Sequence, residues 1–184
     1  MKRSYFTFCM LLILGKTFCQ TNSTDNYLSW SSERRLTIND FGIRTNNLQT
    51  SSSFAQFSMQ FEVGGFGFMS KNFNKKVHNY FIKSASWIDT AYDINLSIKY
   101  QQTLFDICEI YTRRFRKDLK ENKRKFIKGN DFVNELNAKA MTDFANRRIE
   151  YDTETKSGTD KEKQLLWEIQ IQKELDELKD FSGE

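Results

Sequence analysis

Residues Leu96 to Lys117, LSIKYQQTLFDICEIYTRRFRK, form the stretch that decides the predicted fold. The apolar side chains in and just after it fall at helical spacing, and they are Tyr100, Leu104, Ile107, Cys108, Tyr111, Phe115 and Leu119. Positions three, four or seven residues apart share one face of an α-helix. The sequence therefore predicts one long helix with a single apolar stripe, whose residues we expect in the core.

Upstream of this helix the apolar pattern changes to that of β-strands. The residues near alternate positions are Phe54, Phe57, Met59, Phe61 and Val63, and residues 77–88 form a second extended run. Between the two runs, Gly64-Gly65-Phe66-Gly67 is typical of a turn or bulge. It lacks a following Gly-Lys-Ser/Thr, so it does not match a phosphate-binding loop.

Downstream of the long helix the sequence predicts two further helices. Lys128-Gly129-Asn130-Asp131 should end the first helix, and Asp131 can cap a second that runs to about Arg148. A polar loop over residues 152–158 should precede a last helix from about Asp160 to Phe181. Strands followed by helices are typical of an α+β domain, here an N-terminal antiparallel sheet followed by about three helices.

The first 19 residues have the pattern of a signal peptide. Met1-Lys2-Arg3 is basic, the apolar run from Tyr5 to Gly15 is only about 11 residues long, and cleavage is expected after Cys19. Lipidation of Cys19 is disfavoured because the bulky Phe18 precedes it. We expect residues 20–27 to be a flexible lead-in and residues 28–181 to form one domain, exported to the periplasm or beyond the cell.

The net charge bears on the binding partner, and the cysteine content bears on disulfide bonds. Without Lys2, Arg3 and Lys16 the Lys and Arg total falls from 28 to 25 against 24 acids, so the formal net charge falls from +4 to +1. This near balance does not favour nucleic acid as a partner. Cys108 is then the sole cysteine, which excludes an internal disulfide, and its place on the apolar stripe indicates a buried small hydrophobe.

The long helix also resembles the signature of a family of secreted zinc proteases, common in Bacteroidetes and known as domain of unknown function nine-twenty-two. That signature reads roughly Leu-Leu-x-His-Glu-Gln-x-His-Phe-Asp-Ile-x-Glu-x-Tyr-Ala-Arg. The positions that match are Gln102, Phe105, Asp106, Ile107, Glu109, Tyr111 and Arg113. Segments that resemble others of the family, in the same order, are residues 36–41, 86–88 and 151–158, followed by Gln164 and Trp167. The resemblance covers most of residues 28–178 and implies a zincin-like fold.

At the catalytic positions the sequence departs from the family. Tyr100 and Leu104 stand where the family has its two zinc-binding histidines, Gln101 where it has the general-base glutamate, and Ser157 where it has a downstream histidine. Zinc is expected in the family, but the ligands are missing here, and the chain has one histidine, His78, outside all these positions. A neutral Gln101 cannot accept a proton. The resemblance therefore implies a pseudoenzyme without catalytic residues, cofactor or bound metal.

Two other interpretations of these positions stay open at this point. Tyr100 and Leu104 also fit as ordinary core residues of the apolar stripe. The second interpretation is an active metal-dependent peptidase with non-standard ligands. Its candidate oxygen ligands are Asp106, Asp152, Tyr151 and Glu154. However, Asp106 lies about 200° around the helix from Leu104, which favours structural hydrogen bonding for Asp106 and Glu154. His78, in a strand-like run, is expected to be structural.

Three functions follow as hypotheses. A pseudoenzyme could retain a cleft at Trp87, Asp106, Tyr151 and Glu154 and bind a peptide or protein by pairing it with the strand at residues 86–88. The second is the peptidase with non-standard ligands. The third is an envelope-associated interaction protein that binds anionic surfaces through residues 113–128, which carry nine basic side chains. The sequence favours no oligomeric state.

Overall fold

The structure is a computed structural model that describes residues 23–47, 51–61, 67, 69–128 and 131–183. The predicted signal peptide and the Gly64-Gly65-Phe66 part of the predicted turn lie outside these residues. The strands are β1 (Tyr27–Ser29), β2 (Ile43–Thr45), β3 (Ser53–Phe61) and β4 (Val77–Asp89). The helices are α1 (Ile94–Glu121), α2 (Asp131–Glu154) and α3 (Lys161–Glu177), with short 3-10 turns η1 (Ser23–Asn26), η2 (Ile38–Asp40), η4 (Phe73–Lys76), η5 (Lys123–Lys128) and η6 (Lys179–Phe181).

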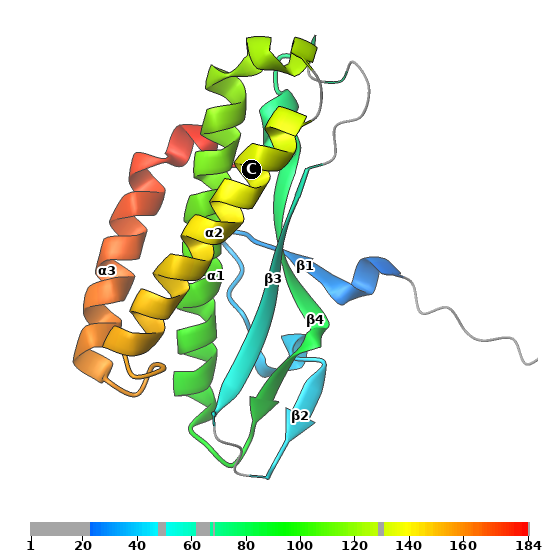
Figure 1. The fold of residues 1–184 in the computed structure, drawn as a ribbon. Coiled ribbons are helices and arrows are strands. Elements are labelled where there is room, and N and C mark those ends of the chain that lie inside the picture. The colour runs from blue at the N-terminus through cyan, green and yellow to red at the C-terminus, as the bar shows by residue number, and fades with distance from the viewer. Residues whose placement is uncertain (1–22, 48–50, 62–66, 68, 129–130, 184) are drawn as a thin grey trace, which may run out of the picture.

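The prediction of an α+β domain is confirmed, because a sheet in the N-terminal half precedes three helices (Figure 1). η1 and β1 include residues 23–27, which belong to the predicted lead-in. All three other strands pair with β4. β3 lies along one edge of it, whereas β1 and β2 share the other edge, at Tyr80–Ile82 and Trp87–Asp89.

The sheet is mixed, so the prediction of a wholly antiparallel sheet is wrong. β1 and β3 run antiparallel to β4, but β2 runs parallel to it. The chain reverses direction between β1 and β2, and the backbone N–H of Gly42 then bonds Lys83 O over 2.9 Å. A side-chain Cβ at residue 42 would stand 2.5 Å from that oxygen, so only glycine allows this close approach. Alternation of apolar residues reports which face is buried but not strand direction.

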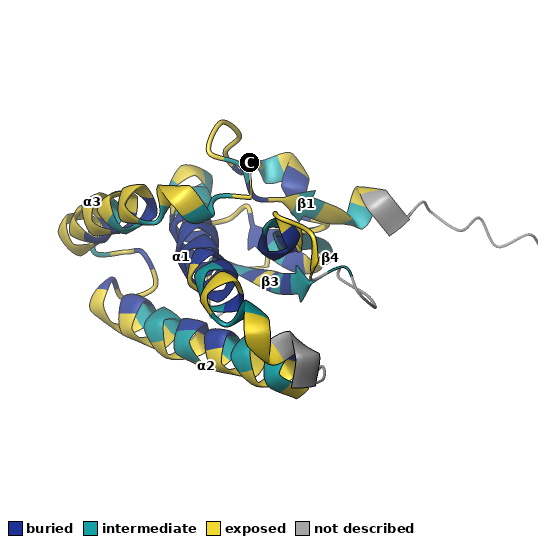
Figure 2. Cartoon of the chain, turned by 90° about the horizontal axis from the view of Figure 1, so that it is seen from above, coloured by how far each residue is buried: buried dark blue, intermediate teal, exposed yellow. Residues whose placement is uncertain are grey.

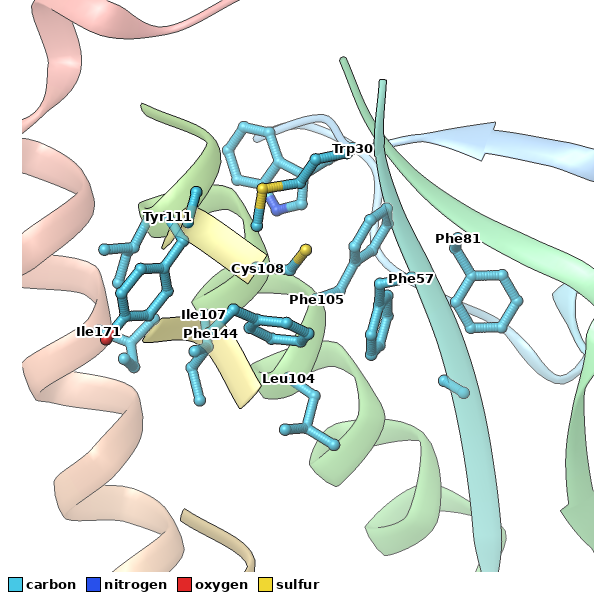
Figure 3. Packing of buried hydrophobic residues seen from close by; sticks show 14 of the residues in the cluster. Trp30, Phe57, Phe81, Leu104, Phe105, Ile107, Cys108, Tyr111, Phe144 and Ile171 are labelled. Carbon is cyan, nitrogen blue, oxygen red and sulfur yellow. The ribbon is translucent and has the colours of Figure 1, made fainter. Parts of the chain in front are cut away.

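The helices lie on one side of the sheet, as Figure 1 and Figure 2 show. α1 packs directly on β3 and β4. α3 lies on the side of α1 that faces away from the sheet, and α2 runs alongside α1, nearer to β3. Phe57 of β3 stacks on Phe105 of α1 with ring centroids 5.4 Å apart and meets Phe144 of α2 edge-on at 6.1 Å. Figure 3 shows these rings with Leu104 and Cys108 in one cluster. The apolar stripe predicted for this helix is therefore the centre of the core.

Side-chain caps define the N-termini of α1 and α3, and a change of backbone conformation follows the C-terminus of α2. The carboxylates of Asp93 and Asp160 accept hydrogen bonds from Leu96 N and Lys163 N, both at 3.1 Å, and so cap α1 and α3. α2 runs to Glu154, beyond its predicted end at Arg148, so the polar loop predicted from residue 152 is shorter than expected. α2 ends just before Lys156, Ser157 and Gly158, which all adopt positive φ.

Candidate functional site

The structure brings together two of the four positions at which the sequence departs from the protease signature. Tyr100 is 6% exposed, its ring stacks on Tyr151 at 5.3 Å, and its hydroxyl donates a hydrogen bond to Asp152. The Ser157 side chain also hydrogen-bonds Tyr100. A Cβ on the neighbouring Gly158 would stand 2.7 Å from the Cβ of Tyr100, so the loop lies directly against the ring. Burial and the Asp152 carboxylate raise the pKa of Tyr100 well above its ordinary value.

The other two positions, Gln101 and Leu104, are completely buried. Gln101 Nε2 donates to Ser53 Oγ at 3.0 Å, which joins α1 to β3. Its Oε1 has no hydrogen-bond partner within the described part of the chain. Figure 3 shows Leu104 among the buried side chains that pack around α1. The side chains of Tyr100, Gln101 and Leu104 are therefore buried and occupied with packing or hydrogen bonds, whereas Ser157 is exposed.

A chain of hydrogen bonds joins α1, α2 and α3 behind Tyr100. The Tyr151 hydroxyl meets Gln164 Oε1 at 2.5 Å, and Gln164 Nε2 donates to Thr103 Oγ1 at 2.9 Å. The indole of Trp167 donates to Glu154 Oε2 at 2.8 Å. Burial raises the pKa of Tyr151 well above its ordinary value, so the hydroxyl stays protonated. Tyr151 and Glu154, predicted as cleft residues, lie on α2 and join the helices.

The predicted cleft is not assembled from its four residues. Trp87 alternates with the fully buried Ser86 and Ile88, so its side chain lies on the sheet face turned away from α1. Its strand is also paired on both sides, with Ile43 of β2 and Phe54 of β3. Within the described part of the chain, Trp87 and Ile88 thus have no free backbone edge to which a peptide could add in the predicted way.

Asp106 lies on another side of α1, as its angle from Leu104 predicts. It accepts hydrogen bonds from Trp30 Nε1 at 2.8 Å, Gln102 Nε2 at 2.9 Å and Arg35 Nη1 at 2.7 Å. Burial raises the pKa of Asp106, and Arg35 with the two neutral donors opposes that rise. These bonds tie the segment after β1 to α1, which is a structural task.

A groove runs beside Asp106, between α1 and α3. One pocket of about 400 Å³ is floored by Leu36, Ile98 and Ile171 and edged by Arg35 and Gln102. A second pocket of about 260 Å³ continues it towards the start of α3, since Asn95 and Lys99 line both. Lys99 and Glu168 pair across it at 3.0 Å. Sequence reasoning missed this groove because it depends on how two distant helices pack.

Next to Trp30, α1 also carries a buried ionic cluster. Glu109 Oε1 accepts from Arg116 Nη1 at 2.7 Å and from Arg113 Nε at 3.1 Å, and all three residues are at most 5% exposed. Arg116 further donates to Val77 O at 2.7 Å, and Arg113 to Leu175 O at 2.8 Å. Two of the nine basic side chains of residues 113–128 are therefore internal, and not part of a solvated face.

Five other basic side chains of that segment, between residues 117 and 125, gather at one end of the molecule, whereas Arg114 pairs with Glu174 of α3 at 2.9 Å. Lys123 Nζ donates to the backbone oxygens of Met69 and Ser70 at 3.3 and 3.4 Å, which places η5 beside the segment before β4. That segment adds lysines that are distant from the others in the sequence and join them only in the fold. The exposed or half-exposed members of this basic end are Lys71, Lys75, Lys76, Lys117, Lys120, Lys123, Arg124 and Lys125.

Four further observations bear on the candidate chemistry and location. His78 lies on β4 with its ring 5.8 Å from that of Tyr80, and Cys108 is fully buried, where burial raises the pKa of its thiol. Among the described residues, no three His, Cys, Asp or Glu side chains come together as a metal site requires. No helix in that part of the chain is long and apolar enough to cross a membrane.

Comparison of the chain with protein-family models, curated proteins and solved structures gives no match. The resemblance to the zinc-protease family therefore stays a prediction that depends on the residues quoted for it.

Proposed function

We propose that this chain is an exported, non-catalytic domain of zincin-like type that binds a peptide segment of another protein. The observation that supports it most is the burial of Tyr100, Gln101 and Leu104, three of the four positions at which the sequence departs from the protease signature. Tyr100 is bonded to Asp152 and Ser157, Gln101 to Ser53, and Leu104 is enclosed by the core. A metal-dependent hydrolase needs an open coordination position for its water, and these side chains occupy that space.

The charge state of the same residues supports the absence of hydrolysis. The amide of Gln101 is neutral and cannot take a proton from an attacking water. The phenol of Tyr100 stays protonated because its pKa is raised by burial and by Asp152. A phenol in that state is a poor metal ligand, since ligands bind in their deprotonated form.

The α1–α3 groove is the place where a peptide fits best. It combines an apolar floor, formed by Leu36, Ile98 and Ile171, with the exposed amides of Asn95 and Gln172 along its sides. Apolar side chains of a peptide can lie on such a floor while its backbone bonds the flanking amides. This site replaces the strand-pairing mode predicted for Trp87.

The first test measures zinc in the purified, untagged protein together with peptidase activity. We expect less than about a tenth of an equivalent of zinc and no zinc-dependent hydrolysis. Near one equivalent of zinc, with hydrolysis, would contradict the proposal and favour the peptidase with non-standard ligands.

Binding is tested separately by selecting a displayed random peptide library on the same protein. Selected peptides should lose affinity by at least about tenfold when Ile98 is replaced by Arg in the groove. The matched control is Ile149→Arg, because Ile149 is an exposed isoleucine on α2 outside the groove. Peptides that respond equally to both changes, or failure to select any, would contradict peptide binding there.

A second candidate function is favoured by the basic end. Lys71, Lys75 and Lys76 join the charges of η5 only through the fold, and the resulting patch suits an anionic surface. We expect the protein to bind vesicles with about 30% anionic phospholipid and to dissociate steeply as salt rises. Arg124→Gln with Lys125→Gln should weaken binding, whereas Lys161→Gln with Lys163→Gln on α3 should not. Equal effects of the two pairs would exclude this function.

A further inference from the structure

The outward face of α3 carries three exposed apolar side chains. Leu165, Leu166 and Ile169 are 52%, 54% and 60% exposed. The buried side chains of the same helix, Gln164, Trp167, Ile171 and Leu175, lie on the opposite side at 100° per residue. Figure 2 shows α3 at the margin of the molecule with exposed residues along its outer side. Only one of its two apolar faces packs on the described protein.

Charged residues flank the exposed stripe symmetrically. Glu162 precedes Leu166 by four positions, and Lys173 follows Ile169 by four. Successive members of this set are four, three and four positions apart, which places all of them on one side of the helix, as in the contact positions of a coiled coil. The set is Glu162, Leu166, Ile169 and Lys173. Both charges are exposed, and Lys173 forms a 3.9 Å surface pair with Glu177.

We propose that this face binds a second copy of the chain, with the two α3 helices antiparallel about a two-fold axis. Leu166 then lies against the partner's Ile169, and Glu162 against the partner's Lys173. The stripe is self-complementary in this direction, because its order of acid, apolar, apolar and base reverses onto itself with opposite charges facing. A parallel pair would instead set Glu162 against the same residue of the other copy.

The contact is small, which sets the expected affinity. A single helix pair falls in the class of interfaces below about 1,200 Å², so we expect dimers to form between about 10 and 500 μM protein. None of these four side chains lines the α1–α3 groove, so the dimer leaves that groove open. Self-association is therefore independent of the proposed peptide binding.

Sedimentation velocity of the purified protein from about 5 μM to 1 mM tests the proposal, with circular dichroism to verify that each variant is folded. We expect the mass to rise towards that of a dimer, and Ile169→Glu to abolish the rise. Ile149→Glu is the control, since Ile149 is 64% exposed on α2. A monomer at all concentrations, or equal effects of the two changes, would overturn the proposal.

A charge exchange tests the antiparallel register. Glu162→Lys alone and Lys173→Glu alone should each weaken dimerisation by about tenfold, because two like-charge contacts replace two favourable ones. The double variant should recover the original affinity, and an equimolar mixture of the two single variants should form heterodimers. If neither the double variant nor the mixture recovers affinity, this arrangement is wrong.

Discussion

The indole nitrogen of Trp30 donates a hydrogen bond of 2.8 Å to Oδ1 of Asp106, 76 positions later in the chain. With the Arg35 and Gln102 bonds to the same carboxylate, it attaches the segment after β1 to the middle of α1. A catalytic carboxylate must keep an oxygen available to its substrate, but both oxygens of Asp106 are engaged. The bond therefore identifies Asp106 as a structural residue.

Asp106→Ala should lower the free energy of unfolding by about 2–4 kcal/mol, since Trp30 and Gln102 would lose a buried acceptor. Urea unfolding followed by tryptophan fluorescence measures it. Asp25→Ala is the control, because the Asp25 side chain is 92% exposed in its pair with Lys83. An Asp106→Ala protein as stable as wild type would contradict the structural role.

Glu109→Ala should be more harmful, because it leaves Arg113 and Arg116 buried without their shared carboxylate. Removing one partner of a buried ionic cluster costs about 3–5 kcal/mol. Thermal and urea unfolding should show the loss, whereas Glu121→Ala, at an exposed carboxylate of the same helix, should stay within about 0.5 kcal/mol of wild type. Similar stabilities for the two variants would show that the cluster contributes little.

Asp40 should give stability a dependence on acid pH. Burial raises the pKa of Asp40, but hydrogen bonds from Arg34 and Thr37 outweigh it and hold the pKa below the ordinary 3.8. A lowered folded-state pKa stabilises above the unfolded value and is lost as pH falls through the folded value. Asp40→Asn should therefore cost about 1 kcal/mol at neutral pH and less below pH 3.8, measured by urea unfolding. A difference that stays constant with pH would contradict this assignment.

Restoring the protease ligands tests the family resemblance directly. Tyr100 and Leu104 are one helical turn apart, and Ser157 hydrogen-bonds the first of them. The triple variant Tyr100→His, Leu104→His, Ser157→His should therefore bind one Zn²⁺ at about micromolar affinity or tighter. The control moves the third histidine to Thr153, on the exposed side of α2, and should bind more weakly by at least about tenfold. Equal zinc affinities would count against a zincin-like site.

Features that follow from a local sequence pattern could be predicted, whereas features that depend on contacts between distant residues could not. The apolar stripe of α1 is a local repeat, so Leu104 and Cys108 were placed correctly in the core. The direction of β2 was not predictable, because it follows from a reversal near Gly42 and not from residue alternation. The end of α2 was placed early because polar residues 152–154 are helical here, supported by packing of Tyr151 on Tyr100.

The site was predictable to a smaller extent. The proximity of residues 100 and 157 follows from the family resemblance, whereas the hydrogen bond from Tyr100 to Asp152 has no sequence signal. Trp87 was misplaced because a strand's two faces look alike until its neighbours are known. Arg113 and Arg116 read as surface charges, since only the tertiary fold brings Val77 O and Leu175 O to them.

The central place of β4 has a consequence for the order in which the chain can fold. β1, β2 and β3 all precede β4 in the sequence, yet the backbone pairing of each is with it. During synthesis, therefore, the first 76 residues emerge without the strand that they need, and α1 emerges later still. β1, β2 and β3 can form their backbone pairs only after residues 77–89 have been synthesised. Sheet formation therefore begins at its C-terminal strand, late in synthesis.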